Sequence, residues 1–197
     1  MGEFRQRTMA EMAEAASQAD SGVPGHSERV TCYAVKIAEE MGLHSDEISL
    51  LRQAAALHDI GKIALSEDIV GKLGRLTDTE FEVMKMHSTI GLALIENSTE
   101  LRESAPLVRH HHERWDGKGY PDGLKGEEIP VGARIIGVCE AYDTMVSTVP
   151  WQVSKSPQEA LDELRRCSGT QFDSNVVEAF YRSVLSGTTE DESRAAA

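Results

Sequence analysis

Histidines and carboxylates recur along most of this chain, on segments whose apolar spacing is helical. In chain order the series is His26, His58-Asp59, His87, His111-His112 and Glu140. Imidazole nitrogens and carboxylate oxygens are ligands for first-row transition metals, and one carboxylate has two oxygens with which to bridge two ions. The series therefore predicts helices that bring these side chains together as ligands of a two-metal centre.

Apolar residues recur at intervals of three and four over nearly the whole sequence, and no segment shows the alternation of a strand. Capping residues mark the expected helix starts, at Ser45, Thr77, Pro106, Pro130, Ser156 and Asp173. Gly61 is expected to end a helix directly after His58-Asp59, so this pair would face a cavity at a helix C-terminal end. The pattern predicts an all-α fold in a single compact bundle.

The later histidines of the series are also expected to point inward. Four residues would share one face of the helix that starts at Thr77: Met84, His87, Gly91 and Leu94. His111 and His112 are expected on the apolar side of the segment that starts at Pro106. Both segments would therefore carry imidazoles into the interior.

Composition limits the partners and the compartment. The 197 residues, of which 40% are hydrophobic, suffice for the core of one domain. A formal net charge of −13 argues against binding long nucleic acids. The sequence has no run of about 20 apolar residues for membrane insertion and no signal peptide, so a cytoplasmic protein is expected. Cys32, Cys139 and Cys167 lack paired spacing and are expected to be reduced thiols in the core.

Three motifs follow one another in the sequence: HDIGK at 58–62, HHERWDGKGYP at 111–121 and GTQFD at 169–173. This composite resembles the HD-GYP domain family, an all-helical branch of the HD phosphohydrolases. The resemblance implies one HD-GYP domain at 13–186, a helical HD-domain bundle with a GYP-containing loop. Residues 1–12 would be an N-terminal extension or a cloning remnant, and 187–197 a disordered tail. Family members usually work downstream of receiver or other sensory domains, so an upstream domain of this kind is implied.

The resemblance also implies which residues bind metal. The ligand positions are His26, His58, Asp59, His87, His111, His112 and Glu140. They would hold two divalent ions, iron or manganese first, with nickel or zinc as alternatives. Asp59 would bridge the ions, and a hydroxide shared by them would attack the phosphorus atom. His44 and His110 are not expected to bind metal.

Lys62 is similar to a lysine at the family's catalytic centre and would bind the scissile phosphate. Its alternative interpretation is a solvated lysine at a helix end. Gly119 and Tyr120 of the GYP-containing loop would contact a guanine base or a phosphate, or else form only a packed turn. Asp59 and Lys62 are thus the expected catalytic residues.

Three neighbours of the ligands allow two interpretations each. Glu113 and Arg114 would orient the histidine pair or the loop, or would form an exposed ion pair. Asp143, three residues after Glu140, would support the site from behind or would lie on the helix surface.

The chain departs from the family pattern at two of the metal positions. Gly22 stands where members with a third metal carry a glutamate, so two metals are predicted. Glu140 stands where aspartate is usual, and its extra methylene group would alter metal preference or rate.

A third departure concerns the substrate. Val149 and Gln152 stand where many members have two arginines that would hold substrate phosphate. In the same loop, Trp151 would stack on a base and Lys155 would reach the phosphate, as candidate replacements.

Three functions are compatible with the resemblance. The leading one is a metal-dependent phosphodiesterase that opens cyclic di-GMP to pGpG, and the sequence leaves open whether the reaction stops there or continues to GMP. The second is a catalytically weak signalling module that binds a cyclic dinucleotide or a partner protein such as a diguanylate cyclase. The third is a phosphohydrolase of another nucleotide. A homodimer is left open in each case.

Overall fold

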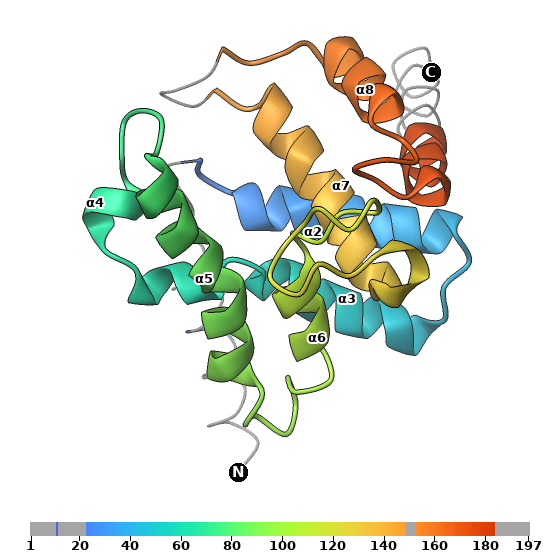
Figure 1. Ribbon diagram of the computed structural model, residues 1–197. Coiled ribbons are helices and arrows are strands. Elements are labelled where there is room, and N and C mark those ends of the chain that lie inside the picture. The colour runs from blue at the N-terminus through green and yellow to red at the C-terminus, as the bar shows by residue number, and fades with distance from the viewer. Residues whose placement is uncertain (1–10, 12–22, 149–152, 184–197) are drawn as a thin grey trace, which may run out of the picture.

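The computed structural model describes residue 11, residues 23–148 and residues 153–183 (Figure 1). The long helices are α2 (His26–Glu40), α3 (Ser45–Leu57), α5 (Asp78–Ile95), α7 (Val131–Val146) and α8 (Pro157–Arg166). The short elements are η1 (Ile60–Ala64), α4 (Glu67–Val70), α6 (Ala105–His110) and η2 (Gly126–Glu128), and residues 174–183 form a further helical segment. Within these ranges β-structure is limited to one isolated bridge, between Ser168 and Phe172. The all-α prediction is confirmed.

Capping hydrogen bonds confirm three of the six predicted helix starts, at Thr77, Ser156 and Asp173. The Oγ1 atom of Thr77 accepts from the Glu80 N–H, and the Glu80 carboxylate accepts in return from the Thr77 N–H. Ser156 starts α8 with the same reciprocal arrangement. The predicted cap at Ser45 is wrong by one residue, because His44 has the extended backbone of a cap and Ser45 is already helical.

Two expectations about helix faces are also corrected. α6 ends at His110, so His111 and His112 lie in the turn that follows and not on the helix itself. On α5 the buried residues include His87 and Ile95, whereas Leu94 is 38% exposed. Residues four apart on a helix lie on one face, and Ile95 continues this spacing from His87 where Leu94 does not.

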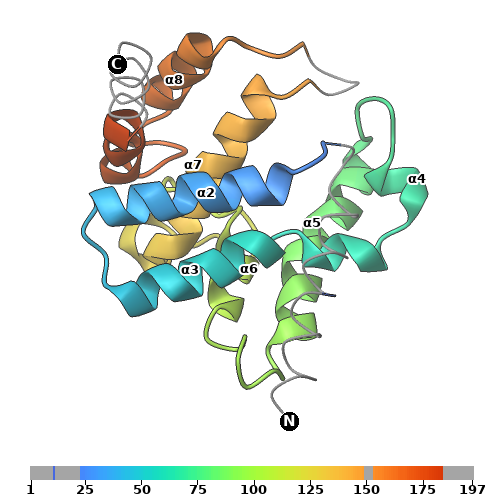
Figure 2. The same cartoon turned by 180° about the vertical axis from the view of Figure 1, so that it is seen from behind.

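The core lies where α2 packs against α3 and α7 (Figure 2). Three aromatic rings join α2, α7 and the segment 174–183: Tyr33, Tyr142 and Phe180, with centroids 4.7 to 5.9 Å apart. Each such ring pair adds about 0.5–1.5 kcal/mol to the free energy gained by burial. This cluster holds the first turns of α2 close to the last turns of α7, where two parts of the candidate site lie.

The thiols do not all lie in the core. Cys139 on α7 is buried and Cys167 is partly buried, but Cys32 is exposed on α2. The expectation of a core thiol is therefore wrong for Cys32, which lies on the outward face of its helix. None of the described helices has both the length and the hydropathy needed to cross a membrane.

Gly61 allows η1 to cross α5 at very short range. A Cβ atom at this position would lie 1.9 Å from the His87 carbonyl oxygen and 2.7 Å from the Gly91 backbone nitrogen. Outside its own residue and the residues next to it in the chain, a Cβ atom essentially never comes within 3.0 Å of another heavy atom. Gly61 therefore does more than end a helix, because it lets the His58-Asp59 turn lie directly against the turn of α5 that carries His87.

We predict that Gly61→Ala lowers the free energy of unfolding by about 3 kcal/mol, the upper part of the usual range for an overpacked site. The added methyl group would meet backbone atoms, which cannot rotate away as a side chain can. Urea unfolding followed by circular dichroism measures the change. Gly71→Ala is the matched control, because its φ is −90° and its Cβ would lie 3.1 Å from the nearest carbonyl. Equal stability of the two variants would contradict the close crossing.

Candidate metal centre

Two groups of potential ligands form where α2, α3, α5, α7 and the turn after α6 meet. Among the described residues, one group is His87, His111 and His112, and the other is His26, His58 and Glu140. Within each group the candidate ligand atoms all lie within 4.8 Å of one another. Six positions of the predicted ligand series thus come together as two sets of three.

Asp59 lies between the two groups. Its Oδ1 atom is 3.4 Å from the Nε2 atom of His87, and its Oδ2 atom is 3.5 Å from the Nε2 atom of His58. One carboxylate therefore contacts a histidine of each group, which is the position that a bridging ligand requires. Burial raises the pKa of this carboxyl, but the adjacent Lys62 ammonium lowers it, and the net result is a pKa well below the usual range. Asp59 is accordingly ionised.

Backbone carbonyls orient three of the imidazoles. The Nδ1 atoms of His58, His87 and His111 lie 2.8, 2.6 and 2.6 Å from the carbonyl oxygens of the residues three positions earlier. A carbonyl only accepts, so each Nδ1 carries the proton and each Nε2 presents a lone pair. This is the usual support for a metal-binding histidine.

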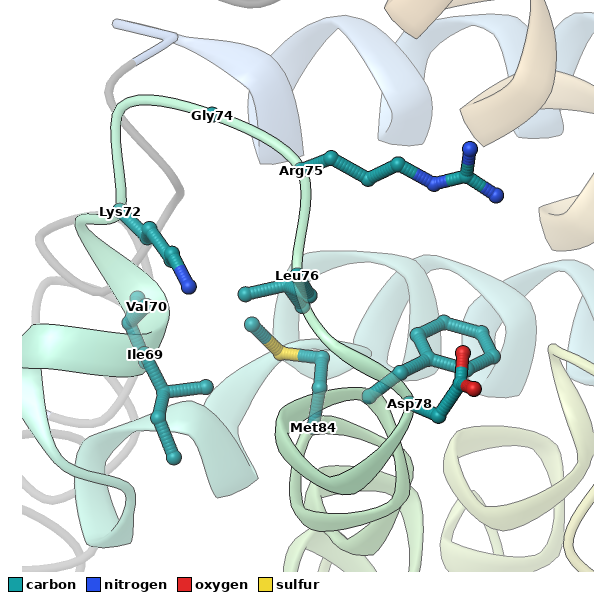
Figure 3. Close-up of a pocket in the computed structure, with 9 residues that line it drawn as sticks. Ile69, Val70, Lys72, Gly74, Arg75, Leu76, Asp78 and Met84 are labelled. Carbon is teal, nitrogen blue, oxygen red and sulfur yellow. The ribbon is translucent and has the colours of Figure 1, made fainter.

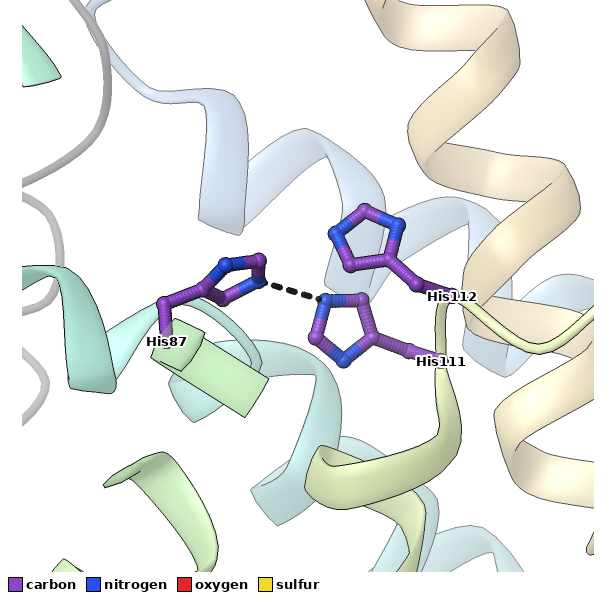
Figure 4. Close-up of side chains that lie close together, drawn as sticks. All are labelled: His87, His111 and His112. Carbon is purple, nitrogen blue, oxygen red and sulfur yellow. Dashed lines mark hydrogen bonds between the residues drawn. The ribbon is translucent and has the colours of Figure 1, made fainter. Parts of the chain in front are cut away.

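Two of these lone pairs face each other. Figure 4 shows the rings of His87, His111 and His112 converging, with the Nε2 atoms of His87 and His111 3.3 Å apart. Because the Nδ1 atom of each ring carries the proton, neither Nε2 has a proton to donate. The contact therefore joins two acceptors. The buried Nε2 of His58 and Oδ1 of Asp59 also have no hydrogen-bond partner among the described residues. A cation would satisfy all four atoms, so the donor set fits the metal ions that the family resemblance implies.

Burial keeps the imidazoles in the form that binds metal. Desolvation lowers the pKa of His87 and lowers the pKa values of His111 and His112 well below the usual range. These histidines are therefore neutral near pH 7, and a neutral imidazole is the ligand species.

Asp143 supports the first histidine from behind. It is completely buried, and its Oδ2 atom accepts from Nδ1 of His26 at 2.7 Å. The Arg29 guanidinium donates to both of its carboxylate oxygens, at 2.6 and 2.9 Å. The interpretation of Asp143 as a helix-surface carboxylate is therefore wrong. Arg29 was missed in the sequence, although it follows His26 by three residues, just as Asp143 follows Glu140.

Lys62 points into the same centre. η1 carries its Nζ atom to 2.5 Å from Oδ2 of Asp59, and the lysine side chain is only 10% exposed. The interpretation of Lys62 as a solvated lysine at a helix end is therefore wrong. This position beside Asp59 is the one expected of a cation that would bind a phosphate oxygen at the centre.

The loop with the sequence Gly119-Tyr120-Pro121 packs directly on the histidine pair. The Tyr120 ring stacks on His112, with centroids 4.7 Å apart and an angle of 30° between the planes, and the Tyr120–Pro121 peptide bond is cis. A Cβ atom on Gly119 would lie 2.6 Å from the His112 carbonyl oxygen, so only glycine fits there. Burial raises the pKa of Tyr120, which therefore keeps its phenolic proton. The loop forms one wall of the centre.

Hydrogen bonds from several directions hold this loop. The buried Glu113 accepts from the backbone N–H groups of Asp122 and Gly123, at 2.7 and 3.0 Å. The N–H groups of Trp115 and Asp116 donate to the carbonyls of Gln171 and Thr170 in the turn after α8. Glu113 thus orients the loop, which agrees with the first of its two interpretations. Arg114 instead forms a partly exposed ion pair with Asp116.

A pocket of about 240 Å³ opens beside the centre. The residues that line it include His111, His112, Glu140, Thr144 and Phe172. Glu140 has an 18% exposed side chain, and its Oε2 atom is 3.7 Å from Nδ1 of His112. The longer glutamate side chain therefore lies at the solvent side of the centre and reaches toward both groups.

The structure separates other predicted residues from the centre. His44 lies at the exposed start of α3, and His110 contacts Asp122 at 2.8 Å, so neither joins the ligand groups found among the described residues. Lys155 is exposed, and its N–H donates to the Met145 carbonyl. Trp151 lies outside the described residues, together with Gly22, Val149 and Gln152.

Sequence comparison places the chain among known proteins. The sequence model of the HD domain family matches residues 10–176. A cyclic di-GMP phosphodiesterase of Thermotoga maritima is 45% identical over 80% of this chain and 43% of its own length. The cyclic di-GMP phosphodiesterase response regulator RpfG of Xanthomonas campestris is 38% identical over 91% of this chain and 48% of its own. The chain thus spans less than half the length of these relatives.

Structural comparison agrees on the fold. An HDG"Y"P protein from Bdellovibrio bacteriovorus superposes with a TM-score of 0.69 at 17% identity, covering 84% of this chain and 53% of that one. The matched family model, the two relatives and the shared helical fold agree with the motifs in the sequence. The chain belongs to the HD domain family, within its HD-GYP branch.

Proposed function

We propose that the protein is a metal-dependent phosphodiesterase that opens cyclic di-GMP to pGpG, with pGpG or GMP as the final product. The observation that carries the proposal is the ionised Asp59 between two groups of three candidate ligands, where the buried Nε2 of His58 and Oδ1 of Asp59 have no hydrogen-bond partner among the described residues. The names of the relatives support the substrate class. The proposed ligands are His26, His58, Asp59, His87, His111, His112 and Glu140.

The side chains around the centre would have different roles in hydrolysis. Asp143 and the three backbone carbonyls keep the imidazoles aimed inward, and burial keeps them neutral. Two divalent ions, when bound there, supply a water of lowered pKa and neutralise charge on the phosphodiester. Lys62 would bind a phosphate oxygen and stabilise the negative charge that develops on it. Tyr120 would cover the centre and offer its protonated hydroxyl to the substrate.

Further details of the proposal concern the metal and the partners. Nitrogen-rich ligand sets with carboxylates suit iron or manganese, with nickel and zinc as alternatives. We propose one HD-GYP domain at 13–186 that works beside a receiver or other sensory domain. A homodimer and a diguanylate cyclase are the proposed protein partners.

A catalytically weak signalling module is the second candidate, because Val149 and Gln152 replace the basic pair that many family members carry. Anaerobic hydrolysis of cyclic di-GMP, on protein reloaded with ferrous iron or manganese, separates the two candidates. Chromatographic appearance of pGpG or GMP supports the phosphodiesterase. Tight binding of the dinucleotide without product supports the signalling module instead.

We predict that Asp59→Ala abolishes hydrolysis and lowers the metal content from about two ions per chain to fewer than one, because the shared ligand is lost. Elemental analysis after reloading counts the metal, and circular dichroism checks that the helices remain. Asp162→Ala, at an exposed position of α8, is the control and should keep both metal and activity. Normal hydrolysis by Asp59→Ala would refute the two-metal mechanism.

We predict that the Lys62→Ala variant keeps its metal and has a kcat about 100-fold lower than that of the wild type. This is the usual effect of removing one preorganised donor to a developing negative charge. Steady-state kinetics on cyclic di-GMP, with metal counted on the same sample, gives both quantities. Lys36→Ala, which removes an exposed lysine from α2, should behave as the wild type does. Unchanged kcat would remove Lys62 from the catalytic residues, and lost metal would assign it a structural role.

A further inference from the structure

A second, larger pocket lies between α4, the connection 71–77 and the first turns of α5 (Figure 3). Its volume of about 410 Å³ is within the range of small-molecule sites, which is about 300–1,000 Å³. Its apolar lining consists of Ile69, Val70, Leu76, Phe81 and Met84. The polar part of the lining is two cations, Lys72 and Arg75, and one carboxylate, Asp78. An apolar cavity with a few charged groups at its edge is typical of a ligand site.

This pocket shares a wall with the proposed metal centre. Met84 lines the pocket with its side chain, while its carbonyl oxygen accepts the Nδ1 proton of His87 at 2.6 Å. Phe81, another lining residue, lies edge-on to Tyr120 with ring centroids 6.4 Å apart, and Tyr120 stacks on His112. Residues that line this pocket thus contact His87 and Tyr120 of the candidate centre.

The two cations differ in their availability. The Nζ atom of Lys72 contacts both carboxylate oxygens of Glu80, at 2.5 and 2.7 Å, so this lysine is engaged in holding the connection to α5. Arg75 is exposed and has no hydrogen-bond or ion-pair partner in the described part of the chain. Figure 3 shows the Arg75 side chain leaving the connection toward the side of the view on which Asp78 lies, and Arg75 is one of the lining residues. A guanidinium therefore stands free at the rim.

We propose that this pocket receives one guanine base of the cyclic dinucleotide whose phosphodiester lies at the metals, an inference that rests on the proposed function. The apolar side chains would cover the faces of the purine. The two N–H groups of the Arg75 fork match the O6 and N7 acceptors of guanine, whereas adenine presents a donor in place of O6. Arg75 would accordingly give the site a preference for guanine over adenine.

The test is Arg75→Gln, measured with cyclic di-GMP, cyclic di-AMP and bis(p-nitrophenyl) phosphate, a phosphodiester without a base. We expect kcat/KM for cyclic di-GMP to fall about tenfold, the usual effect of losing one bidentate arginine–guanine contact. The values for cyclic di-AMP and for the phosphodiester without a base should stay unchanged. Arg102→Gln is the matched control, because Arg102 is also exposed and lies beyond the opposite end of α5.

The outcomes are distinct. An equal loss for both dinucleotides would mean that Arg75 contacts phosphate, and no loss for either would mean that the base lies elsewhere; each result overturns the proposal. If the wild type binds the dinucleotides without hydrolysis, the proposed function fails and calorimetric dissociation constants provide the same guanine-to-adenine comparison. If the wild type binds neither dinucleotide, both proposals fall.

Discussion

The hydrogen bonds from histidine Nδ1 atoms to backbone carbonyls three residues earlier are the interaction on which the rest of the centre depends. They join His58 to Ala55, His87 to Met84 and His111 to Val108. Because donor and acceptor lie within one turn of chain, each imidazole is aimed by its own segment before the segments meet. Tertiary packing then has only to bring the already oriented Nε2 atoms together.

That packing is unusually close, and glycines make it so. Cβ atoms at Gly61, Gly119 and Gly137 would lie 1.9, 2.6 and 2.8 Å from the carbonyl oxygens of His87, His112 and His111, respectively. Each glycine therefore touches the backbone of a histidine in the proposed ligand set. Larger residues would push the segments apart and spread the ligands beyond the reach of shared metal ions. The glycines thus determine the spacing of the centre, while the local hydrogen bonds determine its direction.

Local patterns in the sequence predicted the helices and the ligand set, because capping boxes and histidine spacing are short-range features. They did not predict that α6 would end before His111, since nothing in the apolar spacing there differs from a continuing helix. Local patterns also could not predict what supports His26, because Arg29 and Asp143 lie 114 positions apart in the sequence. Lys62 had two interpretations until packing brought it against Asp59, whereas the contact of Tyr120 with substrate stays a prediction.

The loop from Trp115 to Gly123 is tied to the turn after α8, to the buried Glu113 and to the backbone of His112. A segment held at so many points has little conformational freedom left to lose when a ligand arrives. The wall formed by Tyr120 is thus preorganised and does not act as a flap. Substrate entry would proceed through an existing opening, and the affinity of the site would not be reduced by the entropy of ordering a lid.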